Sequence, residues 1–477
     1  MLKFYLETFG CQMNQLDSEL VESLLRGVLY ERTDTWDGAD LVLFNTCSVR
    51  AHAENKVYSR LGLLRQVKQR RPGMIIAVIG CMAEQEGRTL AARNPHVDVI
   101  CGPGQLHLLA GLIDQAARRG RRAVALSGRF ASMNTPLESS ASFGRLEDLD
   151  LARAASGRAN SFQAYLRISR GCDKFCSFCV VPYTRGREVH RDPQDILTEA
   201  KRLADAGVVE ITLLGQTVNH WHFDRGDGRK MIFADLLEKV HDAAPSVRRL
   251  RFVTSYPRDF AVETLHVMAS SPRFCRYLHL PAQSGSDRIL ARMNRGYTAG
   301  RYLELIERAR QIVPGLELAG DMIVGFCGET DQDAEASLTL LRQARYMNCY
   351  MFKYSPRPGT AAARLYEDDV PEPVKDARHA QMFALQNSIC LENNRAMIGR
   401  TVEVLVEGPS KMTGRPADTR ARTRVPGHVQ LAGRTQSDQV VVFDGPMSLA
   451  GRFVQVAIQD ATTLTLHGSM TERDRPN

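Results

Sequence analysis

The sequence predicts an α/β fold in three parts: an N-terminal parallel-sheet α/β domain, a central partial (β/α)6 barrel and a small C-terminal β-barrel. Two observations lead to this prediction. Short apolar strands alternate with amphipathic helices over most of the 477 residues, which is typical of parallel sheets covered by helices. Beyond residue 400 the helical periodicity gives way to short alternating strands separated by Gly and Pro, which is typical of a small barrel.

The composition along the chain suggests four segments. We expect the N-terminal domain over 1–120, a linker over 121–157, the central barrel over 158–393 and the C-terminal barrel over 394–470. The linker is predicted because its sequence is rich in Arg, Ser, Gly and Ala, which leaves room for at most one short strand or helix.

The overall composition, with 44% hydrophobic and 24% charged residues, is that of an ordinary globular protein without a membrane-spanning segment. The first residues predict a strand rather than a signal peptide, so we expect a cytoplasmic protein with no membrane partner. The eleven cysteines would stay reduced there, which favours metal ligation over disulfides. A net charge of +8 favours a polyanionic partner such as nucleic acid, although an ordinary basic protein can carry the same charge.

Three cysteines of the N-terminal domain occupy equivalent positions in the predicted fold. Its predicted strands are Leu2–Thr8, Asp40–Asn45, Met74–Ile79 and Val97–Ile100, and its predicted helices are Asn14–Tyr30, Ala51–Arg70, Met82–Arg93 and Gln105–Arg119. Cys11, Cys47 and Cys81 each lie just after a strand and before the next helix. Because the carboxyl ends of parallel strands gather in one crevice, we expect these thiols to meet there and to bind a metal.

The alternative is that each of these cysteines is a small buried residue, as free cysteines commonly are. Three such residues at equivalent topological positions favour the metal site. Cys101 also follows a strand, but we leave it out of the predicted site because its Cys-Gly-Pro-Gly setting predicts a turn.

A second set of cysteines, Cys172, Cys176 and Cys179, has the spacing C-x-x-x-C-x-x-C. Thiolates are the ligands of iron–sulfur clusters, and three of them on a cubane of four irons leave one iron open for a chelating molecule. A zinc knuckle is the alternative, but structural zinc prefers four closed ligands and this segment supplies three.

The second set of cysteines follows the first strand of six predicted β/α units. Their predicted strands are Ala164–Arg170, Val209–Leu214, Leu250–Thr254, Tyr277–Leu280, Glu317–Val324 and Cys349–Tyr354. In β/α barrels the active site lies at the carboxyl ends of the strands. Polar residues at these ends are therefore expected to bind a polar cofactor, namely Gly215, Gln216, Asn219, Gln283, Ser284 and Asp321. Arg185, Arg187 and Arg191 are either a solvated rim or phosphate contacts.

The C-terminal segment predicts a helix, Val374–Met397, and then a barrel of the kind that binds single strands or RNA loops. Its strands are expected at Thr401–Val406, Arg424-Val425, His428–Leu431, Val440–Phe443, Arg452–Ile458 and Thr463–His467. Its basic side chains face either phosphates or solvent, namely Lys411, Arg415, Arg420, Arg422, Arg424 and Arg434.

Several motifs together resemble a known family. They are Thr-Phe-Gly-Cys-Gln-Met-Asn at 8–14, Asn-Thr-Cys-Ser-Val-Arg at 45–50, Gly-Cys-Met-Ala at 80–83, Gly-Cys-Asp-Lys-Phe-Cys-Ser-Phe-Cys-Val-Val-Pro from 171, Leu-Leu-Gly-Gln-Thr-Val-Asn at 213–219, Leu-Pro-Ala-Gln-Ser-Gly-Ser at 280–286 and Tyr-Ser-Pro-Arg-Pro-Gly-Thr at 354–360. This combination is similar to the radical S-adenosylmethionine methylthiotransferases. The match extends to about Gly468, where the last barrel is similar to the TRAM module of RNA-modifying enzymes.

The resemblance implies two [4Fe-4S] clusters, with S-adenosylmethionine bound at the open iron of the Cys172/Cys176/Cys179 cluster. Its cleavage would allow removal of the C2 hydrogen of an adenine, and the cluster on Cys11, Cys47 and Cys81 would carry the sulfur that is methylated and transferred. The N-terminal motifs are most similar to the branch that modifies isopentenylated adenosine in tRNA. The alternatives within the family are threonylcarbamoyl-adenosine and a ribosomal-protein aspartate.

The chain departs from the family pattern at Ser177, Thr217, Tyr256, Cys327 and Val189-His190, which affects the expected substituent preference and no cluster cysteine. Expected partners are a tRNA anticodon stem-loop, an electron donor and a sulfur source, and we expect a monomer. The rival of another class is an RNA-binding protein with structural or redox-sensing clusters, which the open ligand positions disfavour.

Overall fold

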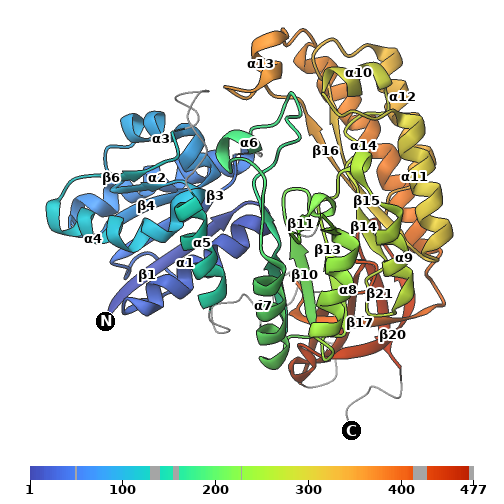
Figure 1. The fold of residues 1–477 in the computed structure, drawn as a ribbon, viewed down its shortest axis with the longest axis horizontal. Helices are drawn as coiled ribbons and strands as arrows, with labels where there is room; N and C mark the ends of the chain where they lie inside the picture. Colours follow the sequence, from blue (N-terminus) through green and yellow to red (C-terminus); the bar gives the residue numbers. More distant parts are fainter. Residues whose placement is uncertain (49–50, 129–139, 154–160, 227, 412–426, 472–477) are drawn as a thin grey trace. The chain divides into compact units, whose positions relative to one another are not determined.

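The computed structural model describes residues 1–477 except 49–50, 129–139, 154–160, 227, 412–426 and 472–477. The chain divides into two compact units (Figure 1). The first comprises 1–206, 213–217 and 357–360, and the second comprises 207–212, 218–356 and 361–477. Among the described residues, none of the helices is both long enough and apolar enough to span a bilayer.

The first unit begins with a six-stranded sheet in the order β2-β1-β3-β4-β5-β6, and all its neighbouring strands are parallel. Its elements are β1 (Leu2–Phe9), α1 (Gln12–Gly27), β2 (Tyr30–Arg32), β3 (Leu41–Thr46), α2 (Ala51–Arg70), β4 (Ile75–Gly80), α3 (Cys81–Arg93), β5 (Val99–Cys101), the 3-10 helix η1 (Pro103–Leu108), α4 (Leu109–Arg119) and β6 (Ala123–Ala125). The four predicted strands are present, shifted by at most two residues, and β2 and β6 are additional edge strands.

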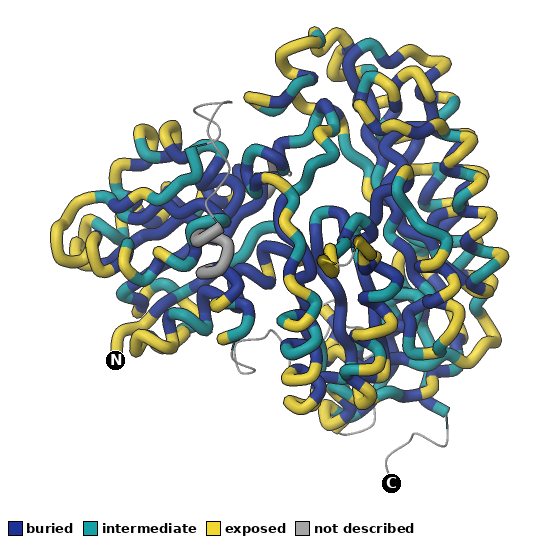
Figure 2. Tube along the Cα trace, viewed as in Figure 1, coloured by how far each residue is buried: buried dark blue, intermediate teal, exposed yellow. Residues whose placement is uncertain are grey.

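Helices cover both faces of this sheet, so its central strands are buried throughout (Figure 2). Alternate residues of a strand point to opposite faces, and the two hydrophobic cores follow that rule. Leu41, Leu43 and Ile79 pack with α1 and α4, whereas Val42 and Phe44 pack with α2 and α3. The near-continuous apolar strands of the sequence are therefore explained by burial on two sides.

The segment expected to be a linker contains more regular structure than predicted. Its described part includes both strand β6, at the edge of the sheet, and the 13-residue helix α5 (Ser140–Ala152). Leu146 of α5 belongs to the same hydrophobic core as Leu41 and Leu43. The expectation of at most one short element is therefore wrong, because this Ser- and Gly-containing stretch becomes helical where its few apolar and acidic residues are buried.

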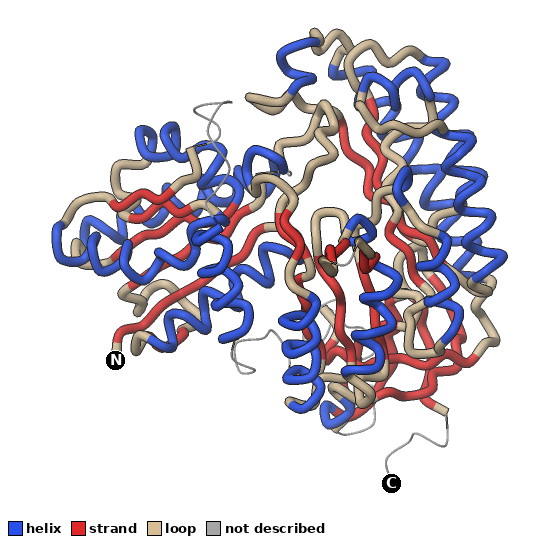
Figure 3. The backbone as a smooth tube through the Cα atoms, viewed as in Figure 1, coloured by secondary structure: helices blue, strands red, loops and turns tan. Residues whose placement is uncertain are grey.

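The remainder of the first unit carries the second set of cysteines. Its elements are β7 (Gln163–Arg167), β8 (Ser169–Arg170), the short helix α6 (Val181–Thr184), β9 (Val189–His190) and α7 (Pro193–Asp205). The predicted strand over 164–170 is thus divided into β7 and β8, and β8 pairs with β9 in an antiparallel ribbon. The long loop between β8 and α6 is drawn in tan in Figure 3.

Strand β10 (Glu210–Leu214) is shared, since its last two residues belong to the first unit and its first three to the second. Within the first unit, the amide of Ile168, directly after β7, donates to the carbonyl of Leu214 (2.8 Å). Within the second unit, the amide of Arg249 in strand β13 (Arg249–Phe252) donates to the carbonyl of Val209 (3.0 Å). The six barrel strands that the sequence predicts are therefore all present.

The second unit continues the β/α alternation with a parallel sheet β14-β15-β16. Its elements before the last barrel are the 3-10 helix η3 (Val218–His220), β11 (His222–Asp224), β12 (Lys230–Ile232), α8 (Phe233–Ala243), β13 (Arg249–Phe252), the 3-10 helix η4 (Pro257–Asp259), α9 (Val262–Ser270), β14 (Tyr277–His279), α10 (Asp287–Arg292), α11 (Ala299–Ile312), β15 (Glu317–Val324), α12 (Asp331–Ala344), β16 (Asn348–Lys353), α13 (Ala361–Leu365) and α14 (Glu372–Arg395). The antiparallel hairpin β11–β12 was not predicted.

The chain ends in a closed five-stranded barrel of order β17-β18-β19-β21-β20, as predicted. Its elements are β17 (Thr401–Pro409), β18 (His428–Arg434), β19 (Val440–Pro446), the 3-10 helix η6 (Met447–Leu449), β20 (Phe453–Ala461) and β21 (Leu466–Met470). The expected strand at Arg424-Val425 lies outside the described residues.

The barrel is attached to β13 through a buried arginine. Arg249 donates to the backbone carbonyls of Arg434 (2.8 Å) and Glu403 (3.0 Å), and Arg248 stacks on the ring of Phe453. The α/β fold class predicted from the sequence is therefore confirmed.

Candidate metal centres

The parallel sheet brings Cys11, Cys47 and Cys81 to one edge. Strands β1 and β3 pair Phe9 with Thr46, and β3 and β4 pair Thr46 with Gly80. The amide of Cys47 continues this ladder by donating to the carbonyl of Phe9 (2.9 Å). Adjacent strands lie about 4.8 Å apart, so thiols that follow three neighbouring strands are within reach of one small centre. We call these three cysteines the strand-end triad.

The side chains of two asparagines support the backbone next to the strand-end triad. Asn14 accepts a hydrogen bond from the Cys11 thiol (3.3 Å) and donates through its side-chain amide to Asn45 (3.0 Å). Asn45, which is fully buried, donates in turn to the carbonyl of Asn14 (2.8 Å) and to the Ser18 hydroxyl (2.9 Å). The start of α1 and the end of β3 are therefore held together by side-chain amides.

The glycines before Cys11 and Cys81 leave space for these amides. A Cβ at Gly10 would lie 2.5 Å from Oδ1 of Asn14, and a Cβ at Gly80 would lie 2.5 Å from Oδ1 of Asn45. Gly80 also has φ +93°, which side chains rarely adopt. The Gly-Cys pairs of the sequence motifs are thus explained by the close approach of asparagine to the backbone.

The surroundings of the strand-end triad shift the pKa values of Cys11 and Cys81 in opposite directions. A hydrogen bond from Cys47 and the charge of Arg185 outweigh burial and lower the pKa of Cys11 to about 6. Burial raises the pKa of Cys81, an effect that the Arg185 guanidinium opposes from 3.2 Å. Cys11 is also the N-cap residue of α1 and Cys81 is the first residue of α3, where the helix dipole stabilises negative charge.

Cys172, Cys176 and Cys179 form the loop triad, which lies in irregular backbone between β8 and α6. The amide of Cys179 donates to the carbonyl of Cys176 (3.0 Å), and the amide of Val181 donates to the Cys179 sulfur (3.5 Å). The Cys172 sulfur lies 3.6 Å from the Thr217 hydroxyl, and burial raises the pKa of Cys172. Between the first two cysteines, Phe175 has a left-handed backbone with φ +47° and an exposed side chain.

Both triads fit an iron–sulfur centre by the chemistry of their donors. All eleven cysteines are free thiols, and each triad offers three sulfurs, which is one fewer than a closed site uses. Cys101, in contrast, is buried in a hydrophobic core with Val99 and Leu106, and burial strongly raises its pKa. The cysteines without a motif are also buried, as expected for packing residues, namely Cys275, Cys327, Cys349 and Cys390.

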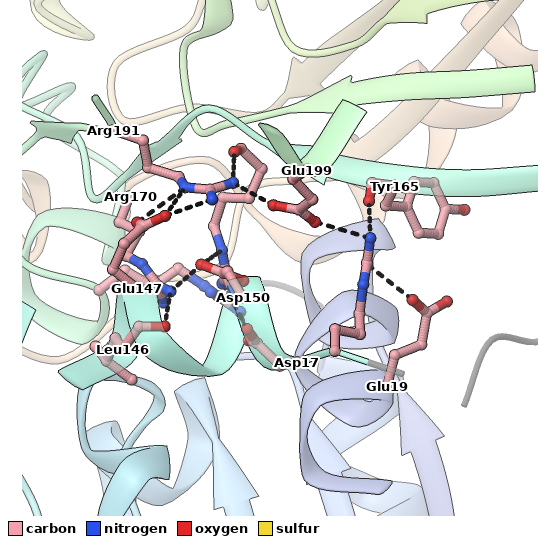
Figure 4. A network of polar contacts seen from close by, with 12 residues as sticks. Asp17, Glu19, Leu146, Glu147, Asp150, Tyr165, Arg170, Arg191 and Glu199 are labelled. Carbon is pink, nitrogen blue, oxygen red and sulfur yellow. Dashed lines mark hydrogen bonds and ion pairs between the residues drawn. The ribbon is translucent and has the colours of Figure 1, made fainter. Parts of the chain in front are cut away.

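A buried network of charges lies between α1, α5, β7 and α7 (Figure 4). Arg167 donates to Asp17 (2.8 Å) and Asp150 (2.6 Å), and Arg170 also pairs with Asp150. Burial alone would raise the pKa of Asp150, but the guanidiniums of Arg167, Arg170 and Arg191 outweigh it and hold that pKa far below its usual value. The network therefore keeps charged groups stable in the interior, because each has a partner.

The structure corrects the interpretation of the arginines after the loop triad. Arg191 is fully buried and donates to Glu147 (2.6 Å) and Glu199 (2.8 Å). The guanidinium of Arg185 is also buried, between Cys81 and Asp17. Neither is a solvated rim or a phosphate contact. Arg187 remains exposed and pairs with Asp173 (2.8 Å).

The residues expected to bind the polar cofactor fall at strand ends in both units. Gly215 and Gln216 follow β10 in the first unit. In the second unit, Asn219 accepts from the amide of Tyr256 (2.7 Å) and donates to its carbonyl (3.0 Å). Its amide group thus fixes the loop after β13.

Gln283, Ser284 and Asp321 lie in the same part of the second unit. The amide of Gln283 donates to the carbonyl of Asp321 (2.8 Å), and Gln283 has φ +73°. Ser284 contacts the Ser337 hydroxyl (3.3 Å). Asp321 is half-buried, with a carboxylate oxygen 3.5 Å from Nε2 of His279.

The predicted basic surface of the last barrel is described only in part. Arg434 pairs with Glu407 (3.1 Å) and Asp438 (3.2 Å), so it is engaged within the barrel. Lys411 is exposed. The other arginines assigned to this surface lie outside the described residues, namely Arg415, Arg420, Arg422 and Arg424.

Sequence reasoning missed Asn14, Asn45 and Asp17, and it named Arg185 with a different role. The asparagines were inside the quoted motifs but had no assigned role. Asp17 lies one turn after Asn14 on α1, where a charged residue is expected to face solvent. The available signal was Asp17 itself, a charged residue in a helix that begins next to the candidate ligand Cys11.

Comparisons with known proteins agree with this arrangement. Residues 3–102 match the uncharacterized protein family UPF0004, residues 166–341 match the radical SAM superfamily and residues 395–471 match the TRAM domain. In fold, the chain is similar to the radical S-adenosylmethionine methyltransferase TsrM of Kitasatospora setae, with a TM-score of 0.51, 16% identity and coverage of 76% of this chain and 77% of that one.

Similarity in sequence is much higher to another group. The tRNA-2-methylthio-N(6)-dimethylallyladenosine synthase of Rhodopirellula baltica is 45% identical over 97% of this chain and 94% of its own length. The protein of the same name from Moorella thermoacetica is 40% identical over 98% of both chains. At this identity over nearly its whole length, the chain belongs to the family of the tRNA-2-methylthio-N(6)-dimethylallyladenosine synthases.

Proposed function

We propose that this chain adds a methylthio group to C2 of N6-isopentenyladenosine next to the anticodon of tRNA. The observation that carries the proposal is the pair of three-cysteine sets, which occurs in a chain 40–45% identical to synthases named for this product. Each set lacks a fourth cysteine, which suits centres that must bind a further group. The reaction belongs to radical S-adenosylmethionine chemistry, which the radical SAM match supports.

The loop triad, Cys172, Cys176 and Cys179, would hold one [4Fe-4S] cluster, and the strand-end triad, Cys11, Cys47 and Cys81, would hold the other. When bound, these groups supply the electron that cleaves S-adenosylmethionine and the sulfur that is transferred. The protein supplies ligands, orientation and exclusion of water. The thiols lie at a sheet edge and in a loop held by backbone hydrogen bonds, and all of them are buried or half-buried, which suits these tasks.

The six residues at the strand ends would contact S-adenosylmethionine in two ways. Gly215, Gln216 and Asp321 offer backbone and side-chain polar groups to its amino, carboxylate and ribose parts. Asn219, Gln283 and Ser284 would shape the loops, since Asn219 and Ser284 already use their side chains within the protein and Gln283 has a strained backbone.

A tRNA anticodon stem-loop is the expected partner because its unpaired bases can be presented to a buried centre. The match to a TRAM domain over 395–471 supports an RNA partner. The chemistry also needs an electron donor and a sulfur source, and we place the reaction in the cytoplasm with the chain as a monomer. The isopentenyl substituent is favoured over threonylcarbamoyl-adenosine or a protein aspartate by the names of the relatives.

The test is expression of this chain in a bacterial host without its own methylthiotransferase, followed by mass spectrometry of tRNA nucleosides. We expect 2-methylthio-isopentenyladenosine with the wild-type chain and only isopentenyladenosine with Cys47→Ala or Cys172→Ala. Unmodified isopentenyladenosine alongside a chain that carries its full iron would overturn the proposal. A gain of 2-methylthio-threonylcarbamoyl-adenosine would instead assign the alternative substrate.

A second assay separates the enzyme from an RNA-binding protein with structural clusters. Reduced protein incubated with S-adenosylmethionine should release 5′-deoxyadenosine, and Cys176→Ala should abolish the release. Retention of intact S-adenosylmethionine by the wild-type chain would support the structural alternative.

A further inference from the structure

Arg185 connects the two cysteine triads within the first unit. It is the C-cap residue of α6, which follows the loop triad directly in the chain. Its Nε donates to the sulfur of Cys81 in the strand-end triad (3.2 Å), and its Nη2 donates to Oδ2 of Asp17 (2.8 Å). The segment that carries one triad therefore supplies a cationic donor to the other.

The orientation of Arg185 is fixed by its partners. Its side chain is 7% exposed, and Asp17 is 1% exposed, so the pair is removed from water. The other oxygen of Asp17 accepts from Arg167 (2.8 Å), which is itself held by Asp150. Because the guanidinium is a rigid planar fork, binding Nη2 to a fixed carboxylate aims Nε at the sulfur.

We infer that Arg185 is a positioning residue that sets the reduction potential of the metal centre on Cys11, Cys47 and Cys81. The inference rests on the proposed function in one respect, since it requires a redox-active centre on that triad. Hydrogen bonds to cysteine sulfurs and nearby charge are among the factors that set iron–sulfur potentials. A buried cation donating to a ligand sulfur stabilises the more negative, reduced state, so it raises the potential.

A purely structural ion pair is the competing explanation, and the geometry argues against it. Asp17 already has Arg167 as a partner, so a second buried arginine is not needed for its neutralisation. Arg185 directs its second donor to sulfur rather than to a carboxylate. Arg185 and Asp17 should then shift the potential in opposite directions, because one is a cation and the other an anion beside the same centre.

The experiment is an anaerobic redox titration followed by electron paramagnetic resonance. It uses the full chain with Cys172→Ala, Cys176→Ala and Cys179→Ala, so that only the strand-end centre contributes a signal. In this background we expect Arg185→Gln to lower the midpoint potential and Arg185→Lys, which keeps the charge, to restore part of the loss. Asp17→Asn should raise the potential.

Arg187→Gln is the matched control, since Arg187 lies two residues further along, is exposed and pairs with Asp173. It should leave the potential unchanged. An unchanged potential in Arg185→Gln with its iron retained would overturn the inference. If Arg185→Gln fails to retain iron, Asp17→Asn decides, and a potential that stays constant or falls in that variant also overturns it.

These measurements are made without tRNA, so their outcome is independent of substrate assignment. A chain that fails to modify tRNA but shows opposite shifts for Arg185→Gln and Asp17→Asn retains the inference and loses the proposed function. If Arg185→Gln methylthiolates tRNA normally and its potential is unshifted, the proposed function is retained and the inference is lost.

Discussion

The two cysteine triads are assembled in different ways. The strand-end triad comes from three segments far apart in the chain, which a buried parallel sheet aligns through the register of β1, β3 and β4. The loop triad comes from one short irregular segment between β8 and α6. The first centre should therefore depend on the packing of the sheet, whereas the second should depend mainly on local sequence. This difference can be tested by measuring iron at each triad separately.

The largest difference is expected when one triad is removed. Two cubane clusters carry about eight irons per chain, and Cys47→Ala should reduce this to about four by removing one ligand of the strand-end triad. Cys176→Ala should give the same total while sparing the other centre. Iron and sulfide per chain provide the measurement, with Cys101→Ala as a control that replaces a cysteine of the hydrophobic core. An unchanged iron content in Cys47→Ala would remove the two-centre description.

The loop triad could be predicted from the sequence directly because its spacing is local. The strand-end triad needed one more step, namely the rule that parallel strands end at a common edge. Both predictions rest on cysteines, which are easily distinguished in the sequence from the apolar and charged residues around them. The placement of Cys11, Cys47 and Cys81 at one edge of the sheet follows from chain topology, which hydrophobic periodicity predicts well.

The polar support of the triads could not be predicted in the same way. Arg185, Arg187 and Arg191 alternate in a loop, and the sequence does not distinguish the two that are buried from the one that is exposed. Glu147, a partner of Arg191, lies in α5, a helix whose sequence resembles a linker, and Asp17, the partner of Arg185, lies in α1. Burial of a charge depends on partners distant in sequence, so it becomes visible only in three dimensions.

An intermediate difference in iron content between the two triads is expected when the asparagine hydrogen bonds beside the strand-end triad are removed. Asn45→Ala removes three hydrogen bonds that join β3 to α1, and it leaves the Asn14 amide without its acceptor. The loss should destabilise the protein by about 1–3 kcal/mol and reduce iron at the strand-end triad more than at the loop triad. Chemical denaturation measures the loss of stability, and iron content in the Cys176→Ala and Cys47→Ala backgrounds measures the loss at the strand-end triad and at the loop triad.

Asn55→Ala is the matched control for this substitution, because Asn55 is exposed on α2. Gly80→Ala should have the same selectivity with a larger loss of stability, since its Cβ would meet Asn45 and the backbone of Thr46. Equal loss of iron from both triads in Asn45→Ala would contradict the idea that only the strand-end triad depends on the packing of the sheet.

The smallest difference between the triads is expected from the charge network, because it supports the first unit as a whole. Asp150→Asn leaves the guanidinium of Arg170 without its carboxylate and weakens the pairing of Arg167, at a cost of about 3–5 kcal/mol in unfolding free energy. Both triads should lose iron to a similar extent. Asp148→Asn, an exposed neighbour on α5, should change neither stability nor iron content.

The pH dependence of the Asp150→Asn penalty tests its electrostatic origin. Burial would raise the pKa of Asp150, but Arg167, Arg170 and Arg191 lower it well below the usual value of about 3.9 for aspartate. A carboxyl group whose native pKa is lowered contributes stability that is fully present above its unfolded pKa and is lost only as the pH falls through the native one. The penalty, measured by urea unfolding of wild type and variant in parallel, should therefore be constant between pH 5 and pH 8. A penalty that shrinks toward pH 5 would mean that Asp150 takes up a proton there, which is incompatible with a carboxylate held between guanidiniums.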